Sequence, residues 1–156
     1  MFRIDYDGVW YHEEEPIQRK TLVKLLSDKA LMVDGHGRYW LKSPYEKYQV
    51  DVEDVPFVVI DYALRKQGTA DQDLRLKTNM DEFVLASPTH RLTLRPESRK
   101  GQEVPYVPVR YGLMARISRS VLTNLMNTAL EQADGKVKEV LKIRSRGVYH
   151  PLGRME

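Results

Sequence analysis

Residues 41–57 read LKSPYEKYQVDVEDVPF, and the stretch at residues 85–106 repeats their pattern. Each begins with Leu, one variable residue and Ser-Pro, a sequence typical of a tight turn. Each ends with an apolar run that follows Val-Pro. Between these points, residues 48–52 alternate polar and apolar side chains, which predicts a half-buried strand. The pattern predicts a turn-and-strand unit that occurs twice, with a longer polar tip at residues 96–103 in the second copy.

A second pair of segments also matches. Residues 17–26 read IQRKTLVKLL and residues 117–126 read ISRSVLTNLM, with apolar residues at helical spacing in both. Leucine spacing alone often arises by chance, so the helices by themselves are weak support for a repeat. Because both matches include polar residues, we favour an internal duplication over coincidence. A duplicated pair of half-domains has a seam between them, and ligand clefts form preferentially at such interfaces.

We expect an α+β fold, with a duplicated core of two small domains that are each a curved antiparallel sheet with one helix. The first domain covers residues 1–65, and its helix runs from the acids at residues 13–15 to about residue 31. The second domain covers residues 66–156, begins in the loop-like sequence KQGTAD, and has a capping helix at residues 116–130. The end of the chain is interpreted as one more strand and an ordered extension.

The composition is that of a soluble globular protein, since 42% of the 156 residues are hydrophobic and 30% are charged. Apolar runs are short and the N-terminus lacks the order of a secretory signal, so we expect no membrane partner and no export. The absence of cysteine excludes disulfides and thiol nucleophiles and fits a cytoplasmic location. With 25 basic against 22 acidic residues, the net charge of +3 is too balanced to indicate a nucleic-acid partner.

Five basic residues near the C-terminus could follow a phosphate backbone: Lys136, Lys138, Lys142, Arg144 and Arg146. Their alternation with apolar residues favours instead the solvated face of a strand. Direct nucleic-acid binding through this segment is therefore the weaker alternative.

Motifs for catalysis are absent from the sequence. The chain lacks Gly-x-x-x-x-Gly-Lys, Gly-x-Gly-x-x-Gly and Gly-x-Ser-x-Gly, so phosphate-loop, dinucleotide-binding and hydrolase functions have no support. The four histidines, His12, His36, His90 and His150, do not have the spacing of metal ligands. We therefore expect no metal, no cofactor and no enzymatic activity.

Three arginines offer the best candidate anion site. Arg110, Arg116 and Arg119 lie where a strand ends and the second predicted helix begins, so their guanidinium groups and the amides of the first helical turn could bind phosphate or carboxylate. Alternatively, the arginines form a structural network with acids of the first half, namely Glu46, Glu53 and Asp54. The sequence leaves both arrangements open, and they can coexist because a network can frame a pocket.

Further polar residues complete the candidate site. Arg19 opens the first predicted helix, where a cation opposes the helix dipole, so a carboxylate partner is favoured for it. Thr78 and Asn79 could hydrogen-bond a base or a sugar, although such a pair more often caps a turn. His90 lies on the second Ser-Pro turn. The candidate ligand-binding residues at the seam are therefore Arg19, Ser43, Glu46, Lys47, Glu53, Asp54, Thr78, Asn79, His90, Arg110, Arg116 and Arg119.

Several short elements, in a fixed order, resemble those of the bacterial DUF1285 family, a domain of unknown function. They are Asp7-Gly8-x-Trp10, Pro16-Ile17-x-Arg19, Ser43-Pro44-x-Glu46-Lys47, Val52-Glu53-Asp54-x-Pro56-Phe57, Thr78-Asn79, and Val109-Arg110 through Ala115-Arg116 to Arg119. The family's usual Thr-Pro is Ser43-Pro44 here. The resemblance runs from about residue 5 to residue 130. It implies an α+β fold with a duplicated core, a second domain superficially like a pleckstrin-homology barrel, and a binding site between the domains.

The resemblance supplies no catalytic residue, but it implies a nucleotide-like or nucleic-acid-derived ligand and a signalling role. We therefore expect a non-enzymatic module that binds an anionic or nucleotide-like small molecule at the interdomain cleft. The alternative is a scaffold for a protein partner, with a charged seam that is purely structural.

Overall fold

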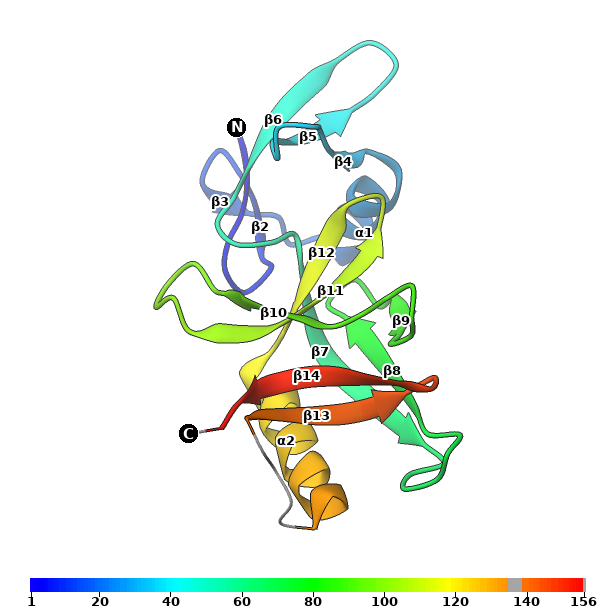
Figure 1. The fold of residues 1–156 in the computed structure, drawn as a ribbon. Coiled ribbons are helices and arrows are strands. Elements are labelled where there is room, and N and C mark those ends of the chain that lie inside the picture. The colour runs from blue at the N-terminus through cyan, green and yellow to red at the C-terminus, as the bar shows by residue number, and fades with distance from the viewer. Residues whose placement is uncertain (135–138, 156) are drawn as a thin grey trace.

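The computed structural model describes residues 1–134 and 139–155. Its N-terminal half is one six-stranded sheet with one helix (Figure 1). The strands of this sheet are β1 (Phe2–Ile4), β2 (Trp10–His12), β3 (Glu15–Pro16), β4 (Leu31–Val33), β5 (Tyr39–Lys42) and β6 (Lys47–Val52). The helix α1 (Lys20–Lys29) connects β3 to β4.

The C-terminal half repeats this plan and adds a hairpin. Its sheet contains β7 (Phe57–Arg65), β8 (Asp73–Thr78), β9 (Phe83–Leu85), β10 (Thr93–Pro96), β11 (Glu103–Arg110) and β12 (Leu113–Ile117). The helix α2 (Arg119–Ala133) follows, and the chain ends in a separate two-stranded sheet of β13 (Val140–Ser145) and β14 (Val148–Arg154). The end of the chain is thus two paired strands, where one had been predicted. Lys136 and Lys138 lie outside the described residues.

The two sheets share one topology. Their strand orders are β3-β2-β1-β6-β5-β4 and β9-β8-β7-β12-β11-β10, so each is a pair of three-stranded meanders whose first and last strands are neighbours. Those neighbours, β1 with β6 and β7 with β12, run parallel, while the other pairs are antiparallel. The predicted α+β fold with a duplicated core is confirmed. Each sheet is mixed, whereas antiparallel sheets were predicted. The parallel pair is possible because a long stretch of chain separates its two strands, and parallel neighbours require such a crossover.

The residue matches behind the predicted repeat do not occupy equivalent positions. Ser43-Pro44 forms the turn between β5 and β6, whereas Ser87-Pro88 lies in the link from β9 to β10. Both segments nevertheless build the same local turn. In each, the Ser amide donates to the carbonyl three residues later (2.8 and 3.1 Å), and the amide of that later residue donates to the Ser hydroxyl. The short sequence determines the turn, and tertiary context determines its place in the sheet.

Both helices begin later than predicted. Residues 15–16 pair with β2 as the edge strand β3, a position that suits Pro16 because it has no amide to donate. The helix α1 therefore begins only after Arg19. Likewise, Ala115–Ile117 extend β12 along β7, so α2 covers Arg119–Ala133. The pairing of β7 with β12 also places the division between the two sheets before β7, ahead of the predicted boundary after residue 65.

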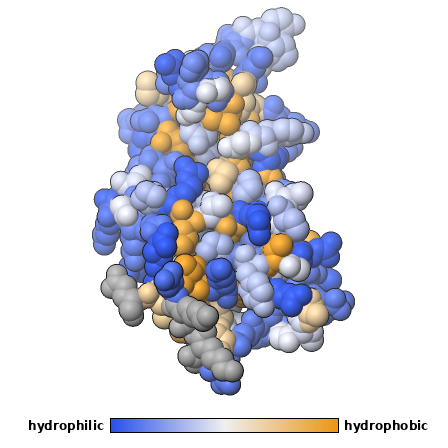
Figure 2. Space-filling model, viewed as in Figure 1, coloured by the Kyte–Doolittle hydropathy of each residue, from blue (hydrophilic) through white to orange (hydrophobic). Residues whose placement is uncertain are grey.

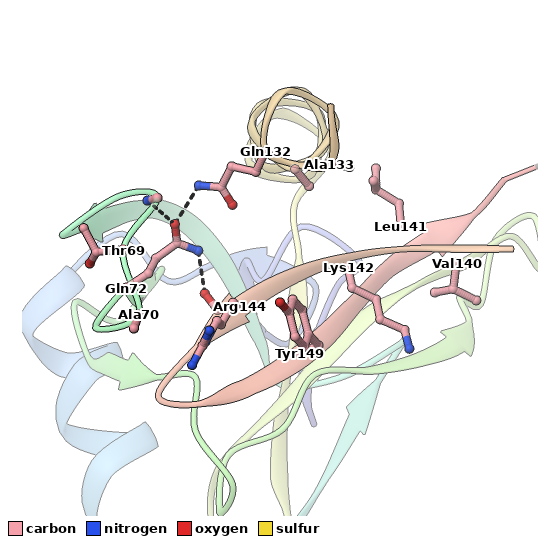
Figure 3. A pocket seen from close by; sticks show the side chains of 12 residues that line it. Thr69, Ala70, Gln72, Gln132, Ala133, Val140, Leu141, Lys142, Arg144 and Tyr149 are labelled. Carbon is pink, nitrogen blue, oxygen red and sulfur yellow. Dashed lines mark hydrogen bonds between the residues drawn. The ribbon is translucent and has the colours of Figure 1, made fainter. Parts of the chain in front are cut away.

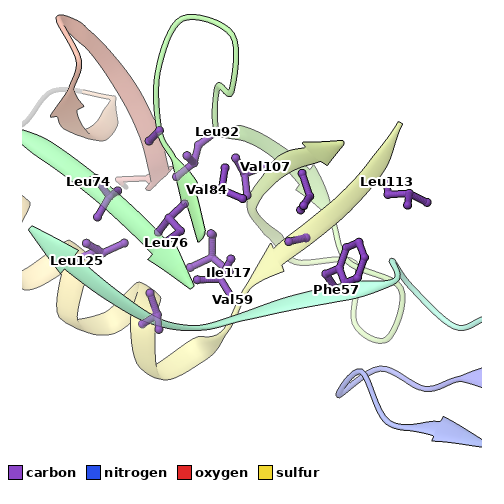
Figure 4. Packing of buried hydrophobic residues seen from close by; sticks show 14 of the residues in the cluster. Phe57, Val59, Leu74, Leu76, Val84, Leu92, Val107, Leu113, Ile117 and Leu125 are labelled. Carbon is purple, nitrogen blue, oxygen red and sulfur yellow. The ribbon is translucent and has the colours of Figure 1, made fainter. Parts of the chain in front are cut away.

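The core of the C-terminal half lies between its sheet, α2 and the β13–β14 hairpin (Figure 4). Val59, Leu76 and Leu125 are among the fully buried side chains. One buried serine attaches the hairpin to the sheet. The hydroxyl of Ser145 accepts a hydrogen bond from the Leu74 amide and donates one to the Ala86 carbonyl, both at 2.7 Å. This anchor fixes the position of the hairpin beside β8 and α2.

Candidate functional site

The seam between the halves is centred on a buried ion pair. Arg116 Nη1 lies 3.0 Å from Asp54 Oδ2, and only 6% and 7% of the two side chains are exposed. Arg116 Nη2 donates to the Tyr6 carbonyl at 2.7 Å. Asp54 also accepts hydrogen bonds from the Tyr106 hydroxyl (2.9 Å) and the Ser98 amide (3.1 Å). Burial, followed by the bond to Asp54, raises the pKa of Tyr106, so its phenol remains a donor. Both terminal nitrogens of Arg116 therefore have protein partners.

Tyr6 links this pair to a second cluster. The guanidinium carbons of Arg116 and Arg99 lie 3.6 and 4.4 Å from the centre of the Tyr6 ring, at cation–π distance. Arg99 Nε bonds Glu53 at 2.7 Å, and the Tyr6 hydroxyl donates to Glu97 at 2.9 Å. These contacts join residues of the first half to the tip between β10 and β11.

Glu97 is held ionised by the loop around it. Burial alone would raise its pKa, but hydrogen bonds from the amides of Arg99 and Lys100, from the Tyr6 hydroxyl and from the Gln102 amide outweigh burial and lower the pKa to about 2. The carboxylate thus organises the tip that Arg99 presents to the seam.

This lowered pKa makes the seam sensitive to acid. The ordinary pKa of the carboxyl is 4.5, so its contribution to stability is present above that value and is lost as the pH falls toward 2. In urea unfolding at pH 7 and pH 3, we expect Glu97→Gln to be less stable than the wild type at pH 7 and to lose less stability on acidification. Hydrogen bonds from Arg38 and Trp40 lower the pKa of Asp34 to about 2 as well. The variant therefore keeps part of the dependence of stability on pH. If the wild type and the variant lose equal stability between pH 7 and pH 3, Glu97 does not couple pH to stability.

A further set of contacts joins α1 to the second sheet. Arg110 bonds Glu82 at 2.8 Å and donates to the carbonyl of Ser27 in the last turn of α1 at 3.1 Å. Asp81 forms ion pairs with Lys20, at 3.5 Å, and with Lys24. Arg110 thus acts as a connector between the halves.

The side chains of Thr78 and Asn79 also form hydrogen bonds with other protein groups. The Thr78 hydroxyl accepts hydrogen bonds from the amides of Met80 and Glu82, which is the turn-capping role. Asn79 Nδ2 donates to the Gly8 carbonyl at 3.2 Å, and its Oδ1 accepts the Val58 amide at 3.1 Å. This amide bridges the two halves.

The remaining predicted residues lie away from Arg116. Ser43, Glu46 and Lys47 are exposed on the β5–β6 hairpin, which projects from the body at the top of Figure 1. His90 borders a separate hollow of about 570 Å³ in the C-terminal half. Arg19 and Arg119 are exposed at the starts of α1 and α2, and within residues 1–134 and 139–155 neither forms an ion pair. The structure thus brings Glu53, Asp54 and Arg116 together, and places the other candidates along the seam or outside it.

A larger hollow, of about 1130 Å³, lies wholly in the C-terminal half (Figure 3). It is bounded by α2, by the loop before β8 and by the β13–β14 hairpin. Its lining residues are Gly68, Thr69, Ala70, Gln72, Ala129, Gln132, Ala133, Val140, Leu141, Lys142, Arg144 and Tyr149. Among the residues that the structure describes, the lining contains two basic side chains and no acidic one. We call this hollow the hairpin cavity.

Gln72 fixes one wall of the hairpin cavity. It is only 2% exposed, its Oε1 accepts the Gly68 amide at 2.9 Å, and its Nε2 donates to the Arg144 carbonyl at 2.7 Å. The amide of Arg146 in turn donates to the Gln72 carbonyl at 3.2 Å. Gln72 therefore ties the loop to the strand that carries the basic residues.

The charged wall comes from the hairpin. Lys142 and Arg144 lie two residues apart on β13 and so share one face, and Tyr149 is the cross-strand partner of Arg144. Arg144 Nε is buried without a hydrogen-bond partner, and among the described residues neither base forms an ion pair. Such a wall offers positive charge and an aromatic ring to a ligand.

Sequence reasoning identified the two bases only as part of a basic segment and missed Gln72, Gln132 and Tyr149. The alternation of Lys142 and Arg144 was the one available signal, because it places both on one strand face. The contribution of α2 depends on tertiary packing, which a single sequence does not reveal.

Two family models match the chain in succession. The N-terminal domain of DUF1285 matches residues 1–55, and the C-terminal domain of DUF1285, a protein of unknown function, matches residues 56–152. The chain belongs to the DUF1285 family. The two models of this DUF1285 protein meet where the chain passes from β6 to β7, at the division between the sheets.

Two solved structures resemble this DUF1285 protein. A DUF1285 family protein from Silicibacter pomeroyi DSS-3 is 29% identical, with a TM-score of 0.84, over 98% of this chain and 79% of that one. A DUF1285 family protein from Shewanella baltica OS155 is 22% identical, with a TM-score of 0.60, over 81% of this chain and 91% of that one, and supports the fold alone. No curated protein matches the chain. The likeness of the second half to a pleckstrin-homology barrel stays a prediction.

The face shown in Figure 2 is largely hydrophilic, and its hydrophobic residues form small separate groups. In the described part of the chain, neither helix has the length and apolar character needed to cross a bilayer.

Proposed function

We propose that this DUF1285 protein is a non-enzymatic module that binds a small anionic molecule, and that the ligand occupies the hairpin cavity. The observation that carries the proposal is the described lining of this cavity, which contains Lys142 and Arg144 and no acidic residue. We place the ligand there and not at the predicted seam site, since Arg116 and Asp54 bind each other and neighbouring protein groups at the seam.

The chemistry of the wall favours an anion with a flat apolar part. Lys142 and Arg144 line the cavity and offer charged donors to a ligand oxygen, and hydrogen bonds between ionised groups are the strong ones. The ring of Tyr149 provides a surface on which an aromatic group can stack. A nucleotide-like molecule meets both requirements, as do other aromatic acids.

A signalling role forms part of the same proposal. The cavity is lined by α2, by the loop before β8 and by the hairpin that Ser145 anchors to the sheet. A ligand that contacts all three elements would favour the arrangement in which they are close together. Occupancy would thereby change the population of conformations that a partner meets.

Titration calorimetry with inorganic phosphate, AMP and 4-aminobenzoate tests the proposal. We expect Arg144→Met to weaken binding of the organic anions by about 10- to 100-fold, since a charge-assisted hydrogen bond is lost. Arg119→Met removes an exposed arginine outside the cavity and should leave affinity unchanged. Binding by none of the three anions, or an equal loss in both variants, would refute the proposal.

The alternative, a scaffold for a protein partner, shares the structural seam but requires no small ligand. The exposed aromatic rings of Tyr45 and Tyr48 on the projecting β5–β6 hairpin favour it. The same titration separates the two functions, because a pure scaffold gives no heat with any of the three anions.

A further inference from the structure

The amide orientation of Gln72 is set by the backbone. Its Oε1 must be the oxygen, because it accepts the Gly68 amide at 2.9 Å. Its other end must be the nitrogen, because it donates to the Arg144 carbonyl at 2.7 Å. Main-chain groups cannot exchange donor and acceptor roles, so a flipped amide would lose both bonds. The orientation of Gln72 is therefore fixed.

Gln72 in turn orients Gln132. The two side chains are joined at 2.6 Å, and because Gln72 contributes its oxygen there, Gln132 must contribute its nitrogen. The oxygen of Gln132 is left over as an acceptor, and Figure 3 shows Gln132 on α2 with this oxygen turned toward the space between α2 and the hairpin. Within the described residues this oxygen has no hydrogen-bond donor.

The hairpin cavity thus has two unlike walls. Lys142 and Arg144 on β13 provide positive charge, and Gln132 on α2 provides a bare acceptor. The Tyr149 ring lies beside Arg144 on the hairpin wall, between Arg144 and Lys142 (Figure 3). An anion that lacked a donor would leave the Gln132 oxygen without a partner when water is displaced, which costs affinity.

We infer that the cavity selects aromatic anions that carry a hydrogen-bond donor, such as an amino or hydroxyl group, at the end away from their negative charge. Gln132 is the residue that determines this specificity, and Gln72 is the positioning residue that keeps its oxygen turned to the ligand. The inference rests on the proposed function, since it assumes that an anion occupies the hairpin cavity.

The test compares 4-aminobenzoate with benzoate, which differ in one donor group, by titration calorimetry. We expect the wild-type protein to bind 4-aminobenzoate about three- to tenfold more tightly, the range that one neutral hydrogen bond supplies. In Gln132→Met this preference should disappear while the affinity for benzoate stays the same. Gln102→Met, an exposed glutamine outside the cavity, is the matched control and should keep the preference.

The outcomes separate the two proposals. Equal binding of both acids by the wild type, or a preference that survives in Gln132→Met, overturns the role of Gln132 and leaves the anion site standing. Failure of both acids to bind overturns the proposed function and this inference with it. Because Gln132 is exposed, the variant is expected to fold, and thermal unfolding of each variant verifies this.

Discussion

Arg116→Met is expected to destabilise the protein by about 3 to 5 kcal/mol, the cost of breaking a buried ion pair by removing one partner. The variant would leave the Asp54 carboxylate buried without its countercharge, and the Tyr6 carbonyl would lose its donor. It would also remove a guanidinium that stacks on the Tyr6 ring. Urea denaturation followed by circular dichroism measures the loss.

Two further variants make this result specific. Arg119→Met replaces an exposed arginine and should change the free energy of unfolding by less than about 0.5 kcal/mol. The double variant Arg116→Met with Asp54→Asn should cost clearly less than the sum of the single changes, because the two side chains contact each other. A loss below about 1 kcal/mol for Arg116→Met would mean that the pair does not hold the halves together.

Gly8→Ala is expected to cost about 3 kcal/mol, through backbone strain and a lost hydrogen bond. Gly8 has φ of +82°, a conformation that L-residues adopt at a cost. A Cβ at this position would overlap Nδ2 of Asn79 and lie 3.3 Å from its Cγ. Displacing Asn79 would leave the Val58 amide without its acceptor at the seam. Thermal unfolding of the variant and the wild type measures this loss of stability.

Gly101→Ala is the matched control for this prediction. Gly101 has φ of +71°, but a Cβ there would meet nothing within 4 Å. The Gly101→Ala variant should therefore lose only the free energy that the positive φ costs an alanine, about 1 kcal/mol. If the two variants lose equal stability, the contact between Gly8 and Asn79 contributes nothing beyond the turn itself.

Parts of the seam could be predicted from the sequence because charged side chains that become buried need partners of opposite charge. A basic cluster at Arg116 and an acidic pair at Glu53 and Asp54 have to be compensated if they are buried, so a network between the halves was one of the two predicted arrangements. The alternative of an open anion site at these arginines required free guanidinium nitrogens. At Arg116 both terminal nitrogens bind protein groups, because the side chain is buried against Tyr6 and Asp54, and burial is not visible in a single sequence.

The duplication illustrates a second limit. Local sequence determined the paired turns at Ser43 and Ser87 correctly, since a Ser hydroxyl caps the same short turn wherever it occurs. It could not reveal that these turns occupy different places in their sheets, because strand order depends on contacts between distant segments. The hairpin cavity also depends on contacts between distant segments, because Gln72 and Gln132 meet only through packing of α2 against the loop before β8.

The most direct test of the account is to map the backbone amide chemical shifts of the nitrogen-15-labelled protein during titration with 4-aminobenzoate. We expect the shifts to change at Gly68, Lys142 and Arg144 around the hairpin cavity and to stay constant at Asp54 and Arg116. Changes centred on Asp54 and Arg116, with a constant β13–β14 hairpin, would contradict it and return the ligand to the seam.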